Sequence, residues 1–345
     1  MLKDTPVYDI AKDEVLNENL LPFVKNADPR SAYTVWRKHR AYLKTNRTAE
    51  RIVAQTGGES TREAKRRLSL SDCYWIKYGY DKDIRFSDIT PYHNPFSLMD
   101  IQQGTVRSDA VPELVLGGSQ PKQWGRGQDG ITYMSKAEQS GQIHAEMLAV
   151  KLAQASGLKT MNAFVRTEKG KLYAKAYPVD FDYSSIGIIN IINITNINRS
   201  MIQLDQLGIG VNGYNIASIV EAYYRAGVEE EVESIALTQI LFDAVIGNID
   251  RKSNNSNWAI FLNHETGKRT PGWLYDFNWA NLSTEALEMT AHVVSYVRLA
   301  KLEQVAVQLL LPIESACLEL NLNLWHSNTR KLIDAFQNAP GVDGL

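Results

Sequence analysis

The chain has 345 residues, of which 44% are hydrophobic and 22% charged, as is ordinary for a globular protein with a sizeable core. Its 37 Lys and Arg nearly balance its 39 Asp and Glu, so the net charge of −2 gives no general attraction for anionic lipid, and we do not expect direct binding of nucleic acid. The two cysteines, Cys73 and Cys317, argue against a disulfide framework and a cysteine-based zinc site. The N-terminal residues show no apolar signal segment, and no apolar run reaches the roughly 18 residues of a membrane span, so we expect a cytoplasmic protein.

Residues 1–68 are rich in charge and predict an N-terminal helical extension. Within them, the segment 33–58 mixes basic residues with spaced apolar ones and ends at a double glycine, which is typical of a helix stop. Two interpretations remain open for this extension. It is either a solvated helical addition or a surface on which a partner docks.

Residues 69–178 have a different texture, in which aromatic and β-branched residues recur, and they predict a β-rich unit. Over 113–138 we expect a strand, a Gly-rich turn, a second loop and a strand that carries Lys136. Residues 142–158 predict an amphipathic helix, because their apolar side chains form a broad stripe. The segment 160–178 predicts a hairpin with its turn at "EKGK".

Residues 179–345 predict a mainly helical unit. The Ile- and Asn-rich segment 186–198 is interpreted as a loop between elements or a packed edge. Residues 228–248 carry acids in a first turn, which suits the helix dipole, and then continue as an apolar helix. The segments "WAIFL" (258–262) and "GWLYDF" (272–277) predict short strands, and amphipathic helices follow. The fold class is therefore α+β, with proposed divisions at 1–68, 69–178 and 179–345.

The stretch "GNIDRKSNN" (247–255) places more charge and amide between two apolar elements than a turn requires. It is the fourth of five features that follow in order along the chain. These are a Gly turn, a strand lysine, a helix acid, a D-x4-N loop and a later aspartate: Gly117 and Gly118, Lys136, Glu146, Asp250 to Asn255, and Asp276. Each feature alone is usually structural, so the order is what indicates a function.

Phosphoryl transfer from ATP fits this order, because that reaction requires alignment and charge neutralisation more than covalent chemistry. A Gly loop lets backbone N–H groups approach the phosphates, and a lysine held by a glutamate neutralises their charge. An aspartate orients the acceptor hydroxyl, while an amide and a second carboxylate supply the oxygen ligands that Mg²⁺ prefers. The β-rich unit followed by a helical unit also matches the two lobes of protein kinases.

The chain departs from common eukaryotic kinases, since it lacks H-R-D, D-F-G, A-P-E and G-x-G-x-x-G motifs. It resembles instead the HipA-like serine/threonine kinases of bacteria over roughly residues 69 to 290. The segments that carry this resemblance are "GGSQPK", "SK" followed by "HAEMLAVKLAQASGL", "IGNIDRKSNN" and "LYDFN". The segment "SLSDCYWIK" is similar to the "SLNDxYWxK" of one subgroup.

The resemblance implies a two-lobed kinase fold, ATP and Mg²⁺ as cofactors, and a role for each matching residue. Asp250 would be the catalytic aspartate, and Asn255 and Asp276 would hold the metal. ATP would contact the Gly loop, the lysine strand, the glutamate helix and a hinge facing the adenine: Gly117, Gly118, Ser119, Gln120, Lys122, Lys136, Glu146, Lys175, Ala176 and Tyr177. Lys252 stands where the family usually has His, and we expect it to stabilise charge on the transferring phosphoryl group.

The resemblance also implies serine/threonine protein kinase activity, and by analogy a toxin of a toxin–antitoxin system with an antitoxin partner and a protein substrate. Two alternatives remain open. The chain could be a non-catalytic nucleotide-binding regulator, or a kinase that acts on a small molecule, since a fold does not determine an acceptor. Val115 stands where some family members carry an autophosphorylated serine, and Ser119 is the nearest substitute.

Overall fold

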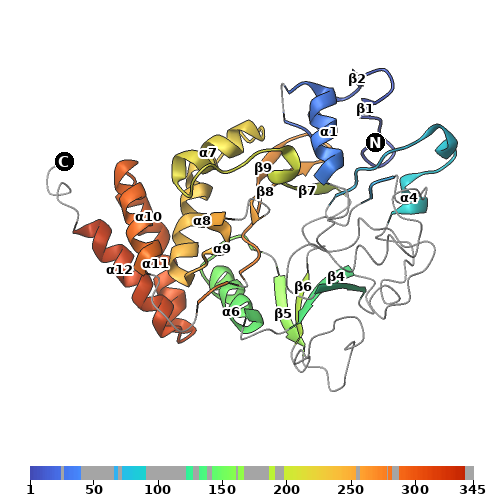
Figure 1. The fold of residues 1–345 in the computed structure, drawn as a ribbon. Helices are drawn as coiled ribbons and strands as arrows, with labels where there is room; N and C mark the ends of the chain where they lie inside the picture. Colours follow the sequence, from blue (N-terminus) through green and yellow to red (C-terminus); the bar gives the residue numbers. More distant parts are fainter. Residues whose placement is uncertain are drawn as a thin grey trace.

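The computed structural model describes residues 1–24, 27–39, 66–68, 72–90, 122–126, 132–137, 142–160, 162–166, 186–190, 198–253, 257–277, 279–281 and 287–338. Within these ranges the chain combines three small antiparallel sheets with longer helices, which confirms the α+β class. Figure 1 shows the C-terminal helices gathered at one end of the molecule, with other helices between them and the sheets. Among the described helices, none is long and apolar enough to cross a membrane.

The N-terminal residues form a short hairpin rather than the expected helix. Strands β1 (Tyr8–Asp9) and β2 (Glu14–Val15) pair, the 3-10 helix η1 (Glu18–Leu20) follows, and helix α1 (Pro29–His39) begins only afterwards. The helical prediction is therefore wrong for residues 1–24. The rest of the predicted 33–58 helix, from residue 40, lies outside the described residues.

The described residues of this N-terminal part pack into the main core. The Met1 ammonium group donates to the carbonyl of Trp75 at 3.0 Å, and the Trp75 indole donates to the carbonyl of Lys3 at 2.7 Å. The Tyr74 hydroxyl donates to the carbonyl of Leu20 at 2.6 Å. Tyr74 and Trp75 are each 1% exposed, so both rings belong to the interior. The 3-10 helix η3 (Gly79–Asp81) and the short helix α4 (Phe86–Ile89) follow them.

A four-stranded sheet carries the lysine strand. Its strands are β3 (Lys122–Arg126), β4 (Thr132–Ala137), β5 (Asn162–Arg166) and β6 (Ile186–Asn190), in the order β3-β4-β6-β5. Lys136 lies on β4 as predicted, opposite Lys122 on one side and Gly187 on the other. The predicted helix is α6 (Gln142–Ala155), which packs against β5 and β6.

The loop interpretation of 186–198 is wrong for its first residues, because β6 is an internal strand that pairs on both sides. A run of isoleucines has the β-branched character of a buried strand, and the asparagines obscured that pattern. The predicted partner of β5 beyond the "EKGK" turn, the hinge and the division at residue 178 lie outside the described residues.

The helical part is built around α8 (Val232–Ile246), whose side chains are buried on nearly all sides. Such a helix is apolar all round because other elements surround it. The helices that complete this part are α7 (Ile216–Arg225), α10 (Leu287–Leu299), α11 (Glu303–Glu319) and α12 (Asn323–Gln337). Asn328 on α12 donates to the carbonyl of Val245 at 2.9 Å, which ties the last helix to α8.

A third sheet delivers the segment that contains Asp276. It consists of β7 (Arg199–Gln203), β8 (Ala259–Asn263) and β9 (Arg269–Pro271), in that order, with the 3-10 helix η5 (Asp205–Leu207) after β7. The strand predicted at "WAIFL" is confirmed as β8. The strand prediction for "GWLYDF" is wrong, because the residues that pair with β8 are 269–271 and residues 272–277 do not continue the strand.

Gly272 ends this pairing at a close backbone contact. Its N–H donates to the carbonyl of Ala259 at 2.7 Å, and a Cβ atom at this position would lie 2.6 Å from that oxygen. Only glycine fits so near another backbone. Beyond it, Leu274 makes one parallel bridge with Thr160, and the chain then runs irregularly through Asp276.

Candidate functional site

The polar loop 247–255 begins at the C-terminal end of α8. Gly247 takes the left-handed conformation with φ +68°, and its N–H bonds back to the carbonyl of Asp243, as is common where a helix ends in glycine. After Ile249 the chain forms the single-turn helix α9 (Asp250–Ser253) before it enters β8. Because the last turn of α8 is buried, the core fixes where the polar loop begins.

Asp250 lies half-buried at the start of α9, and one of its carboxylate oxygens accepts a hydrogen bond of 2.6 Å from the Asn257 carboxamide. Asn257 is 3% exposed, so this amide is fixed by its surroundings. The contact orients the Asp250 carboxylate. Lys252, two residues later, is exposed.

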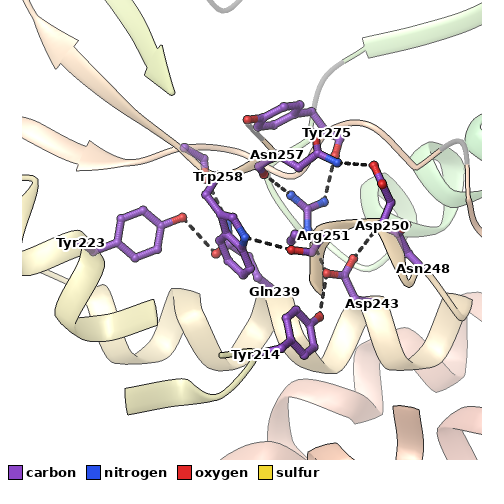
Figure 2. Close-up of polar contacts among 11 residues, drawn as sticks. Tyr214, Tyr223, Gln239, Asp243, Asn248, Asp250, Arg251, Asn257, Trp258 and Tyr275 are labelled. Carbon is purple, nitrogen blue, oxygen red and sulfur yellow. Dashed lines mark hydrogen bonds and ion pairs between the residues drawn. The ribbon is translucent and has the colours of Figure 1, made fainter. Parts of the chain in front are cut away.

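Arg251 points the other way, into the protein, and is 1% exposed. Its Nε donates to Asp243 at 2.8 Å, one terminal nitrogen donates to the carbonyl of Asn257, and the other donates to the carbonyl of Tyr275 at 2.8 Å. Figure 2 shows this guanidinium between the polar loop, the start of β8 and the segment before Asp276. The Trp258 indole donates to the carbonyl of Arg251 at 3.1 Å, so the backbone of this residue is held as well.

Asp243 on α8 is the counter-ion of Arg251. Besides Arg251, its carboxylate accepts hydrogen bonds from the Tyr214 hydroxyl at 2.8 Å and the Asn248 amide at 3.0 Å. Burial raises the pKa of Asp243, and Arg251 with these two donors acts to lower it, so the ionised carboxylate depends on them. Burial by itself would lower the pKa of Arg251, but Asp243 together with Tyr214, Tyr275 and Tyr223 outweighs burial, and the pKa is raised.

Asp276 follows directly on the carbonyl that Arg251 binds. Its backbone is in the left-handed region with φ +58°, an uncommon conformation for a residue with a side chain. On either side of it, Tyr275 is 8% exposed and Phe277 is fully buried, with its ring 5.5 Å from that of Phe242 on α8. The half-buried Asp276 side chain is therefore carried between two anchored aromatic residues.

The predicted helix acid, Glu146, is 2% exposed on α6. A carboxylate buried to this extent normally has a partner. For Lys122 and Lys136 the structure describes the backbone in β3 and β4. The other predicted residues lie outside the described part of the chain: Gly117, Gly118, Ser119, Gln120, Lys175, Ala176, Tyr177 and Asn255.

Sequence reasoning assigned no role to Arg251, Asp243 or Asn257, although they form the core of the polar cluster. One signal for Asp243 was available. It is a lone acid within the apolar helical run "TQILFDAVIGN", and a charge in a fully buried helix requires a partner. Nothing in the spacing indicated that the partner is Arg251, eight residues later.

Comparisons with known proteins bear on the fold. No protein-family model and no characterised protein sequence matches the chain. Among solved structures, HipA of Shewanella oneidensis, in a complex with HipB and operator DNA, is similar over 98% of this chain and 96% of its own, with a TM-score of 0.56 and 12% identity. The kinase CtkA of Helicobacter pylori covers 62% of this chain and 92% of its own, with a TM-score of 0.42 and 13% identity. Over nearly its whole length, the chain therefore has the fold of a HipA protein.

Proposed function

We propose that this chain is an ATP- and Mg²⁺-dependent serine/threonine protein kinase of the HipA type. The observation that carries the proposal is the joining of the two acidic segments. A single buried guanidinium, that of Arg251, is adjacent in sequence to Asp250 and hydrogen-bonded to the residue before Asp276. Arg251 thereby links the segments that carry Asp250 and Asp276 to α8, which supports a shared site for the two carboxylates within a HipA-like fold.

In this proposal each residue acts through its charge and position. Asp250, oriented by Asn257, accepts a hydrogen bond from the acceptor hydroxyl and takes its proton as the phosphoryl group transfers. The exposed Lys252 neutralises charge on the transferring group. Asp276 offers a hard carboxylate oxygen of the kind that suits Mg²⁺, and Asn255 would complete that ligand pair. The metal would neutralise the charge of the nucleotide phosphates.

The finer assignments follow the resemblance. Lys136 and Glu146 would hold the phosphates from β4 and α6, and the 117–122 loop and the 175–177 hinge would cover the nucleotide. The divisions at 1–68, 69–178 and 179–345 are part of the same proposal. Because the similar HipA structure contains HipB, we also propose an antitoxin as partner. A protein substrate and a cytoplasmic location of the chain itself belong to the same proposal.

A phosphoryl-transfer assay tests the proposal. Purified chain is incubated with radiolabelled ATP and Mg²⁺, alone and with a lysate of a bacterial host, and labelled protein is measured. We expect transfer by the wild type and a loss of about 100-fold or more in Asp250→Asn, with ATP binding retained. Asp83→Asn, at an exposed aspartate after η3, is the matched control and should transfer normally.

Three results would contradict the proposal. Equal labelling by Asp250→Asn and wild type would remove Asp250 from the reaction. Tight ATP binding by the wild type with no transfer to any protein would support the non-catalytic alternative. Transfer to a small metabolite in a protein-free extract, with no labelled protein, would support a small-molecule kinase.

A further inference from the structure

We propose that Arg251 is a positioning residue that sets where Asp276 lies relative to Asp250. This inference rests on the proposed function, since it concerns the two carboxylates of that same site. Arg251 touches neither the acceptor nor the nucleotide in this proposal. It acts through the backbone of the segments that carry the reacting groups.

The first argument is the direction of its hydrogen bonds. The guanidinium group is a planar fork with fixed donor directions. Here one direction meets the Asp243 carboxylate on α8, a second meets the carbonyl of Asn257, and a third meets the carbonyl of Tyr275. These acceptors belong to elements before and after the polar loop, so the rigid guanidinium group restrains the distance between those elements.

The second argument is that Arg251 is linked to each of the two proposed carboxylates, those of Asp250 and Asp276, through at most one intervening residue. On one side, Arg251 is the residue after Asp250, and Asn257, whose carbonyl it holds, donates to the Asp250 carboxylate. On the other side, Tyr275 precedes Asp276. A change in the guanidinium therefore moves the two carboxylates relative to each other before it disturbs more distant parts of the fold.

The third argument is the conformation of Asp276. A non-glycine residue in the left-handed region persists only where its surroundings hold it. The bond from Arg251 to the Tyr275 carbonyl is one such restraint, and the buried ring of Phe277 is another. Arg251 thus helps to impose the backbone geometry from which the Asp276 side chain leaves the chain.

The fourth argument is the cost of the arrangement. Arg251 and Asp243 form an ion pair with fully buried side chains, and apolar residues of similar volume often give a core of equal or greater stability. The guanidinium also lies 5.5 Å from the ring centre of Trp258 and 5.7 Å from that of Tyr275, so apolar neighbours are at hand. A gain in stability does not explain why the Arg251–Asp243 pair is buried here. A need to hold the polar loop and the segment before Asp276 at a fixed distance does explain it.

The experiment compares Arg251→Lys with a matched control, Arg269→Lys. Arg269 on β9 is 4% exposed and also holds two backbone carbonyls, those of Ala226 at 2.6 Å and Leu21 at 2.8 Å, but neither belongs to the polar loop or to the segment before Asp276. A lysine keeps the charge in both variants but cannot reproduce the fork. For each protein we measure kcat, the KM for ATP, the Mg²⁺ concentration that gives half-maximal rate, ATP binding without metal, and the urea midpoint.

We expect Arg251→Lys to lose about 100-fold in kcat, as a displacement of about 1 Å can cause, and to need several-fold more Mg²⁺. ATP binding without metal should stay within about twofold, because Arg251 positions Asp276, which in this proposal acts on the nucleotide only through Mg²⁺. Arg269→Lys should lose stability and leave kcat and the Mg²⁺ requirement unchanged. If Arg251→Lys behaves like Arg269→Lys in a chain whose wild type is active, the positioning role is refuted.

A second variant keeps the test decisive if Arg251→Lys does not fold. Trp258→Phe removes the indole N–H that donates to the carbonyl of Arg251 and leaves the guanidinium in place. It should raise the Mg²⁺ requirement by a smaller factor, with some loss of stability because Trp258 is 1% exposed. A Mg²⁺ requirement equal to that of the wild type would refute the inference. A wild type that transfers no phosphate would refute the proposed function instead, so the two failures are distinguishable.

Discussion

The left-handed backbone of Asp276 makes a prediction about stability that is independent of catalysis. Replacing Asp276 by glycine or by alanine removes the carboxylate in both cases, so the two variants differ only in what the backbone tolerates. At φ +58° the Cβ atom of an alanine costs roughly 1–2 kcal/mol, whereas glycine, which has no Cβ atom, avoids this cost. Glycine in turn loses roughly 0.5–1 kcal/mol more backbone entropy on folding than alanine does.

The difference between these two effects favours Asp276→Gly over Asp276→Ala by about 0.5–1 kcal/mol in the free energy of unfolding. At an ordinary helical position the order is reversed. Ser234, exposed on α8, should be about 1 kcal/mol less stable as glycine than as alanine. The sign of the Gly–Ala difference therefore reports the conformation of residue 276 directly.

Urea denaturation of six variants measures these differences, with glycine and alanine placed at Asp276, Ser234 and Lys301. Lys301 has φ +55° in the turn between α10 and α11 and serves as a second left-handed site, far from the polar loop. Both left-handed sites should favour glycine. If Asp276→Ala is as stable as Asp276→Gly while the Lys301 pair behaves as expected, Asp276 is not held in the left-handed region, and the third argument for Arg251 falls with it.

Other expectations follow from burial and exposure. Burial raises the pKa of Tyr223 to about 12 against an ordinary value of 10, so the stability it contributes is present below pH 10 and is lost as the pH rises toward 12. Two pKa units correspond to about 2.7 kcal/mol, and alkaline urea titrations should show a smaller loss in Tyr223→Phe. Lys252→Ala should lower phosphoryl transfer by about 100-fold and change the unfolding free energy by less than about 0.5 kcal/mol, because the side chain is exposed; normal transfer would exclude it from the site. Cys73 and Cys317 are buried thiols, and burial raises the pKa of the Cys317 thiol to about 11, so a thiol reagent should react only after unfolding; fast reaction of the folded chain would contradict this.

Several elements were predictable because their signals are local. The apolar stripe and glycine stop gave α6, the acids followed by an apolar run gave α8, and the β-branched run "WAIFL" gave β8. The order of the polar motifs along the chain was also visible without coordinates. It led to the same HipA-like architecture that the structure shares over nearly its full length.

Other elements were not predictable, because their conformation depends on distant neighbours. Residues 8–15 form a hairpin whose Tyr8 ring packs against Phe23 and Tyr33, and β6 is a strand because β4 and β5 flank it. The segment 272–277 has strand-like residues but leaves the sheet at Gly272, where the backbone of Ala259 lies too close for any side chain. Local propensity is outweighed in each case by tertiary packing.

The polar loop shows most clearly which features the sequence predicts and which depend on the tertiary structure. Composition and spacing by themselves predicted that residues 247–255 carry functional chemistry, with Asp250 and Asp276 as two carboxylates of one site. Only the tertiary structure decided that Arg251, the residue between Asp250 and Lys252, turns inward and joins Asp243, Asn257 and Tyr275. The physical reason is that a buried charge is stable only where acceptors converge on it, and those acceptors come from elements whose meeting in space no spacing along the chain records.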